Sequence, residues 1–167
     1  MHARSSSAAN VVRRRLTALA AMVAAGGLIG GGLGSAAQAD DLPTGTFKLQ
    51  SGHGFCARVD FDLLQSRSCI TLALEEQFVY DLLTKQIRSV SGGLLTCVEE
   101  ADPDVYVLPC DNSSASQKWG RRVVTGGWVV YPYTATRKGL RADEFGGDVT
   151  LDPAPSSADA VWTFPLI

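Results

Sequence analysis

Short alternating or apolar runs, separated by glycine-rich turns, fill the chain after residue 40. Three of them are "GTFKLQSGHG", "KQIRSVSGG" and "GGWVVYPYTATRKG". Such runs are typical of β-strands and the turns that join them. No stretch after residue 40 keeps a helical period over eleven residues, and the nearest, "LALEEQFVYDLL", falls at a boundary of the repeat described next. The pattern predicts an all-β domain.

The same arrangement recurs three times along the chain. The aromatic residues Phe78, Trp119 and Trp162 lie 41 and 43 residues apart, and each follows an apolar run, "SCITLA", "VYVLPC" or "DVTLDP". The third repeat keeps the spacing but places Leu140 and Pro153 where the first two have cysteines. Three all-β repeats of about 40 residues predict a barrel with threefold symmetry.

The first 39 residues have the order of regions found in a secretory signal peptide. Three arginines at 13–15 precede an uncharged Ala/Gly/Leu run at 16–34, and an Ala-x-Ala site follows at 37–39. The run approaches the length of a membrane span, but its six glycines make it a poor helix. We therefore expect ordinary export, although the arginines loosely match a twin-arginine signal, with cleavage after Ala39 and an extracellular mature chain at 40–167.

Charge limits the partners of this mature chain. All 17 acidic residues lie after position 39 but only 11 of the 15 basic ones do, which leaves a net charge of −6. Nucleic acids need a basic face to meet their phosphates. We expect one monomeric domain that binds no nucleic acid and, once cleaved, no membrane.

The cysteines are evenly spaced. Cys56 and Cys69 are 13 residues apart, and so are Cys97 and Cys110. An even number of cysteines in an exported chain predicts disulfides, and the equal gaps favour one bridge within each of the first two repeats. Close Cys-x-x-Cys pairs, which a zinc site would use, are absent from the sequence.

The second repeat resembles the ricin B-type lectin family. The family's hallmark is Gln-x-Trp, here Gln117 to Trp119, and it follows "CVEE" and "VYVLPCD". The first repeat has "EQF" at this place and the third has "AVW". The resemblance covers roughly residues 45–167 and implies a β-trefoil with repeats at about 45–78, 79–119 and 120–162. It places Phe78, Trp119 and Trp162 in the core.

The resemblance also implies shallow pockets for galactose-like sugars or polysaccharides. Family pockets use a carboxylate two residues after the first cysteine, an aromatic ring two before the second, and an Asn beside the hallmark Gln. Carboxylate and amide groups bond sugar hydroxyls, while the ring stacks on the C–H face. The first position holds Arg58, Glu99 and Ala142, with Asp143 available after a one-residue slip, and the second holds Arg67, Leu108 and Leu151.

Most of the pocket pattern is therefore lost, and Ser116 stands where the Asn is expected. The remaining candidates for sugar binding are Glu99, Asn112 and Gln117 in the second repeat and Tyr131, Tyr133 and Asp143 in the third. The two tyrosines fall on one face of an expected strand and either stack on a sugar or fill the barrel.

Signals of catalysis or of a resident metal are absent from the sequence after residue 39. It has one histidine, His53, and no Gly-x-Ser-x-Gly, zinc or P-loop motif. The acidic run "EEADPD" lacks the ligand order and glycine of an EF-hand. We expect a non-catalytic protein without metal or cofactor. Two functions stay open: a carbohydrate-binding module, and a trefoil that has lost sugar binding and binds or inhibits a protein partner.

Overall fold

The computed structural model describes residues 41–143, 146–155 and 158–167. The predicted signal peptide lies outside these residues. The regular structure within them consists of β-strands and three short 3₁₀ helices, η1 (Leu74–Glu76), η2 (Tyr133–Ala135) and η3 (Ala158–Ala160). The all-β prediction is confirmed. In the described part of the chain, no helix has the length and apolar character needed to cross a membrane.

The strands fall into three successive sets. The first set is β1 (Thr46–Phe47), β2 (Gln50–Ser51), β3 (Phe55–Asp60), β4 (Leu63–Ser68) and β5 (Phe78–Asp81). The second set is β6 (Gln86–Ser89), β7 (Thr96–Ala101), β8 (Asp104–Pro109) and β9 (Trp119–Val124). The third set is β10 (Gly127–Pro132), β11 (Gly139–Arg141), β12 (Gly147–Asp148), β13 (Thr150–Asp152) and β14 (Trp162–Thr163). Every pairing between them is antiparallel.

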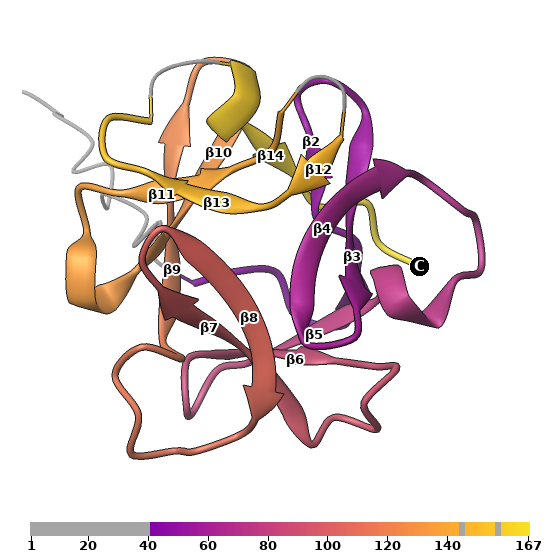
Figure 1. The fold of residues 1–167 in the computed structure, drawn as a ribbon, viewed down its shortest axis with the longest axis vertical. Helices are drawn as coiled ribbons and strands as arrows, with labels where there is room; N and C mark the ends of the chain where they lie inside the picture. Colours follow the sequence, from indigo (N-terminus) through magenta and orange to yellow (C-terminus); the bar gives the residue numbers. More distant parts are fainter. Residues whose placement is uncertain (1–40, 144–145, 156–157) are drawn as a thin grey trace, which may run out of the picture. The chain divides into compact units, whose positions relative to one another are not determined.

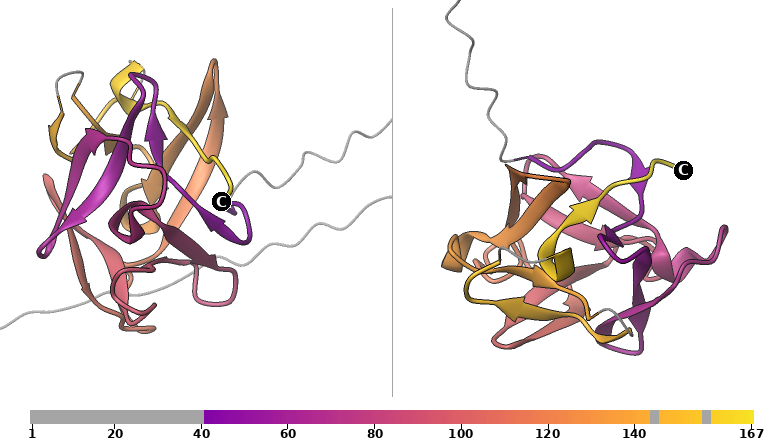
Figure 2. Two further views of the ribbon diagram at one scale, coloured as in Figure 1. Left: turned by 90° about the vertical axis from the view of Figure 1, so that its right-hand side faces the viewer. Right: turned by 90° about the horizontal axis from the view of Figure 1, so that it is seen from above.

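Each set contributes one central hairpin, and the three hairpins surround a common centre (Figure 1). These are β3–β4, β7–β8 and β11–β13. Strand β4 pairs with β8, β8 with β13, and β12 with β4, so the hairpins form a closed ring. The last strand of each set pairs with a strand near the start of another set: β5 with β6, β9 with β10, and β14 with β2. Figure 2 shows the C-terminal segment lying beside the start of the described chain.

The three anchor aromatics begin the last strand of each set. Phe78, Trp119 and Trp162 are completely buried. The indole Nε1 of Trp119 donates to the carbonyl of Val98 over 2.8 Å, and that of Trp162 donates to the carbonyl of Leu140 over 2.8 Å. A buried indole thus fills the core while its N–H is satisfied by the neighbouring hairpin.

Both bridges join a hairpin to the loop that follows it. Cys56 pairs with Cys69 and Cys97 with Cys110, each across 13 residues, so the pairing is the one that the equal gaps predict. The described residues contain no free cysteine.

The alignment of the third repeat with the cysteines requires a correction. The carbonyl of Leu140 accepts the indole N–H of Trp162, just as the carbonyl of Val98 accepts that of Trp119, so Leu140 corresponds to Val98. Val98 follows Cys97, so the residue that corresponds to the first cysteine is Gly139 and not Leu140. The predicted alignment was wrong because the third-repeat hairpin is longer. Leu140 pairs with Leu151, eleven residues on, whereas Val98 pairs with Val107, nine residues on. The residue two after the cysteine position is therefore Arg141 rather than Ala142.

Candidate functional site

The β7–β8 hairpin has one face toward the core and one toward solvent. Val98, Val105 and Val107 are buried on the inner face. Glu99 is on the other face because successive residues of a strand alternate. Tyr106 pairs directly with Glu99 across the hairpin. Directly opposite residues have Cβ atoms about 5 Å apart on the same face, so a carboxylate and an aromatic ring are adjacent there.

The Glu99 carboxylate is held in place by the turn that precedes β9. The hydroxyl of Ser116 donates to one carboxylate oxygen over 3.0 Å, and the amide of Gln117 donates to the other over 2.7 Å. Glu99 is only partly buried. Each carboxylate oxygen can accept more than one hydrogen bond, so acceptor capacity remains for a ligand hydroxyl.

Gln117 is 1 % exposed, and its amide is fully engaged inside the protein. Besides Glu99, its Nε2 donates to the carbonyl of Pro109 over 3.0 Å. Its Oε1 accepts the backbone N–H of Asp111 over 2.8 Å and the side-chain amide of Gln86 over 3.0 Å. Gln117 therefore fixes the loop after β8 and orients Glu99 instead of facing a ligand.

Asn112 lies on that same loop and is exposed. Its neighbour Asp111 organises the turn by accepting the backbone N–H of Ser113 over 2.8 Å and the Ser113 hydroxyl over 2.6 Å. The predicted second-repeat residues are thus on adjoining segments, with Glu99 and Gln117 bonded to each other and Asn112 at the solvent side.

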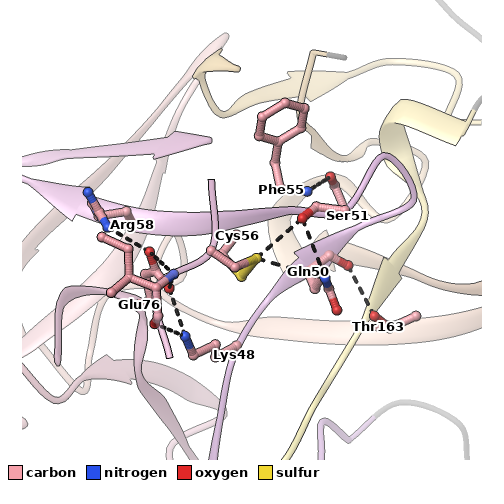
Figure 3. Close-up of a disulfide and its surroundings, with 11 residues drawn as sticks. Lys48, Gln50, Ser51, Phe55, Cys56, Arg58, Glu76 and Thr163 are labelled. Atoms are coloured by element: carbon pink, nitrogen blue, oxygen red, sulfur yellow. Dashed lines mark hydrogen bonds and ion pairs between the residues drawn. A yellow bond between two sulfur atoms is a disulfide. The ribbon is translucent and has the colours of Figure 1, made fainter. Parts of the chain in front are cut away.

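In the first repeat the corresponding positions carry charges. Glu76 stands at the hallmark Gln position and is completely buried. It accepts Lys48 Nζ over 2.8 Å, Arg58 Nη2 over 2.8 Å and the backbone N–H of Ile70 over 2.9 Å (Figure 3). Lys48 also donates to the carbonyl of Ile70. Burial by itself raises the pKa of the Glu76 carboxyl, but the bonds from Lys48, Ile70 and Arg58 outweigh it and hold that pKa below its ordinary value of 4.5.

The two networks place their side chains at equivalent positions and share several bonds. Glu76 takes the place of Gln117, and Arg58 takes that of Glu99. Lys48 takes the place of Gln86. Each of them donates to the carbonyl of the residue after the second cysteine, Lys48 to Ile70 and Gln86 to Asp111. The N–H of this same residue, Ile70 or Asp111, donates to the hallmark side chain in both repeats.

The third repeat has a small apolar residue in place of the hallmark acceptor. Ala160 stands at the hallmark Gln position and is completely buried. Arg141, at the position of Glu99, makes ion pairs with Asp143 over 2.8 Å and with Asp159 over 3.5 Å. Asp143 is exposed and already engaged by a guanidinium.

Tyr131 and Tyr133 pack against each other, with ring centroids 6.0 Å apart. Tyr131 lies on β10 and is 8 % exposed, whereas Tyr133 begins η2 and is 37 % exposed. A Cβ at Gly120 would come within 2.6 Å of the Tyr133 ring, so glycine permits this packing. The structure therefore brings the two tyrosines together, while Asp143 is engaged by Arg141 at the end of β11.

Tyr106 is the residue that the sequence analysis missed. Counting two residues back from Cys110 leads to Leu108, which pairs with Cys97 rather than with Glu99. The sequence feature that could have revealed Tyr106 is the turn at Asp102–Pro103, because a hairpin that turns there pairs Glu99 with Tyr106.

No family model matches the sequence, and the comparison with curated proteins gives no match. Solved structures do match. The cytolethal distending toxin of Haemophilus ducreyi has a TM-score of 0.62 at 16 % identity, over 74 % of this chain and 86 % of that one. The earthworm R-type lectin C-half, solved with GalNAc, has a TM-score of 0.57 at 12 % identity, over 74 % and 98 %. A designed threefold symmetric protein, ThreeFoil, has a TM-score of 0.62 at 15 % identity, over 73 % and 99 %.

The chain is a β-trefoil. At these identities the likeness establishes the trefoil fold, and the site must be argued from its own residues.

Proposed function

We propose that this trefoil is a secreted, non-catalytic module that binds carbohydrate through the outer face of its second-repeat hairpin. The observation that carries the proposal is the pairing of Glu99 with Tyr106 on this face, with the carboxylate oriented by Ser116 and Gln117.

The chemistry suits a sugar. A carboxylate accepts hydrogen bonds from two ring hydroxyls, and a neighbouring aromatic ring covers the apolar C–H face of the same ring. A preorganised acceptor also loses less entropy on binding than a freely rotating one. The earthworm R-type lectin, which shares the fold, was solved with GalNAc, and this supports a galactose-like ligand.

The test is a glycan array followed by calorimetric titration of the best neutral glycan. We expect binding by the unaltered protein and a loss of about tenfold or more for Glu99→Gln, because a charge-assisted hydrogen bond contributes about 1.5–3 kcal/mol. Glu100→Gln is the matched control, since Glu100 is the next residue on the same strand and contacts Thr134. A dark array, or equal losses for the two variants, would contradict the proposal.

A protein partner is the second candidate. Ile70, Leu72 and Leu74, in the loop between β4 and β5, are 53 %, 76 % and 53 % exposed. Apolar side chains gathered on a surface are a feature of protein interaction sites. If the array stays dark, Leu72→Asp tests this reading: it should abolish capture of the partner while the melting temperature is unchanged.

A further inference from the structure

Strand β9 has a strand on one side only. It pairs with β10, and within the described part of the chain no strand pairs with its other side. The last strands of the other two sets are paired on both sides, β5 with β1 and β6, and β14 with β10 and β2. Beside β9 a single backbone bond takes the place of a strand, from the Trp119 N–H to the carbonyl of Lys85 over 2.9 Å. The edge of the sheet is therefore open at residues 121–124.

The backbone of β9 presents free hydrogen-bonding groups at this edge. Successive residues of an antiparallel strand bond alternately to one side and to the other. The β9–β10 turn has two residues, so Val124 and Gly127 form a bonded pair, and Arg122 also bonds β10. Arg121 and Val123 therefore direct their N–H and C=O groups away from β10, and no described residue bonds these groups. Val123 is 64 % exposed, so an incoming strand can reach them.

The opposite end of the sheet shows how this protein covers such an edge. Strand β1 pairs with β5 on one side, and the C-terminal residues run along its other side. The Lys48 N–H donates to the carbonyl of Pro165 over 3.0 Å, and the Ile167 N–H donates to that of Thr46 over 3.1 Å. An extended segment thus covers the β1 edge through main-chain bonds, and β9 has no such cover among the residues that the structure describes.

The lysines and arginines that lack an ion pair gather around this open edge. Seven of the 11 that follow residue 39 pair with a carboxylate. The other four make no ion pair with a described residue, and we call them the cationic strip: Lys118, Arg121, Arg122 and Arg137. The strip is continuous with β9, because Arg122 Nη1 donates to the carbonyl of Thr136, next to Arg137, over 2.7 Å.

The carboxylates around the cationic strip do not neutralise it. They are engaged by other groups: Asp41 by Lys85, Glu100 by Thr134, Asp102 by Lys138, and Asp111 by Ser113. With Lys85 and Lys138 included, this region has six cations against those four carboxylates. The predicted mature chain is acidic overall, so this local excess of positive charge selects an acidic partner.

Arg121 has the clearest need of an anion. Its guanidinium lies 3.8 Å from the centre of the Trp128 ring, and its Nε is buried without a hydrogen-bond partner among the described residues. Burial lowers the pKa of Arg121 below its ordinary value of 12.5, so a carboxylate beside it favours the charged form. Arg121 and Arg122 project from opposite faces of β9, because the side chains of a strand alternate. A strand added at this edge can therefore meet one guanidinium on each face.

We propose that the open edge of β9 binds an extended acidic peptide of a protein partner as an added strand. The main chain of the peptide bonds Arg121 and Val123, and its carboxylates pair with Arg121 and Arg122. A second copy of this chain suits the edge poorly, because two paired β9 strands bring the arginines of both copies together. This surface is separate from the Glu99 face, so the inference does not rest on the proposed sugar binding.

The test is a fluorescence titration with the labelled peptide Thr-Val-Glu-Glu-Val-Thr and with the same peptide carrying Gln in place of each Glu. Adjacent glutamates of an extended strand point to opposite faces, as Arg121 and Arg122 do. We expect the Gln peptide to bind about tenfold or more weakly, and added salt to weaken the acidic peptide. Glu99→Gln should leave peptide binding within about twofold, which keeps this result apart from the test of sugar binding.

Variants of Val123 separate main-chain bonding from attraction by charge. Val123→Pro removes an N–H that points away from β10, so it leaves the β9–β10 bonds in place. Val123→Thr is the matched control because it keeps the N–H. We expect Val123→Pro to weaken the acidic peptide about tenfold or more and Val123→Thr to stay within about twofold, with melting temperatures as the check that both variants fold.

Hydrogen exchange on the unaltered protein gives a readout that needs no variant. The acidic peptide should slow exchange of the Arg121 and Val123 amides and leave that of Arg122 unchanged, since Arg122 already bonds β10. Absence of peptide binding at about 1 mM would overturn the inference. So would binding that leaves the Arg121 and Val123 amides unprotected, which is the result expected of a cationic surface that attracts any polyanion.

Discussion

The first and second repeats build the same hydrogen-bond arrangement from side chains of different charge. In the second repeat a neutral amide, Gln117, bonds Gln86 and the carboxylate of Glu99. In the first, a buried carboxylate, Glu76, bonds an ammonium and a guanidinium. Both fix the loop after the second cysteine through one backbone N–H, so in the two repeats with a disulfide this position supplies a buried acceptor that can be an amide or a carboxylate.

The comparison also shows why charge at one site determines charge at the next. A buried carboxylate needs cations to offset its lost hydration. With Glu76 in place of the amide, its neighbours are the cations Lys48 and Arg58, and a guanidinium stands where the second repeat has a carboxylate. With Gln117 in place, a carboxylate such as Glu99 is a suitable partner, and the outer face becomes negative.

Breaking the charged network should have the largest effect on stability. Glu76→Gln leaves Lys48 buried without its anion and should lower the free energy of unfolding by about 3 kcal/mol or more. Adding Lys48→Gln restores a neutral pair like that of Gln86 and Gln117, and should recover most of the loss. Denaturant unfolding of the single and double variants measures both values. A double variant as unstable as the single one would show that the two networks are not equivalent.

Acid pH should destabilise the charged first-repeat network more than a neutral one, with a smaller effect on stability than that of Glu76→Gln. The pKa of Glu76 is lowered in the folded state, so its contribution to stability is present above its ordinary value of 4.5 and is lost as the pH falls through the folded pKa. The melting temperature of the unaltered protein should therefore fall more steeply below pH 4.5 than that of Lys48→Gln/Glu76→Gln. Asp81 and Asp111, whose pKa values are also lowered, are present in both proteins and cancel in the difference. Parallel pH profiles would contradict this role of Glu76.

Much of the fold is predictable from spacing along the chain. The two cysteine gaps are equal because the first two repeats build the same hairpin, and the aromatic anchors recur at similar intervals because each repeat returns to the core at the same point. The predicted alignment of Leu140 with the cysteines was wrong because the third repeat has a longer hairpin and a shorter loop after it. The two differences nearly cancel in the total number of residues, so counting along the sequence does not reveal either of them.

The candidate site was less predictable because it depends on strand pairing and on coupled changes. Tyr106 lies opposite Glu99 only in the register set by the turn between β7 and β8. Taken singly, Arg58 at a carboxylate position indicates a lost pocket. Only the structure shows that Lys48, Arg58 and Glu76 differ from the second repeat as one bonded set. It also shows a hollow at this place, lined by two guanidiniums and by the carboxylates of Asp60 and Glu75.

The central proposal is that the second-repeat hairpin binds sugar through Glu99, whose carboxylate is held by Ser116 and Gln117. The measurement that tests it most directly is the calorimetric titration of Glu99→Gln and Glu100→Gln with the best neutral glycan, with cooperative unfolding as the check that both variants fold. The account predicts that Glu99→Gln loses about tenfold or more in affinity and that Glu100→Gln keeps the affinity of the unaltered protein. A folded Glu99→Gln that binds the glycan as tightly as the unaltered protein would contradict it.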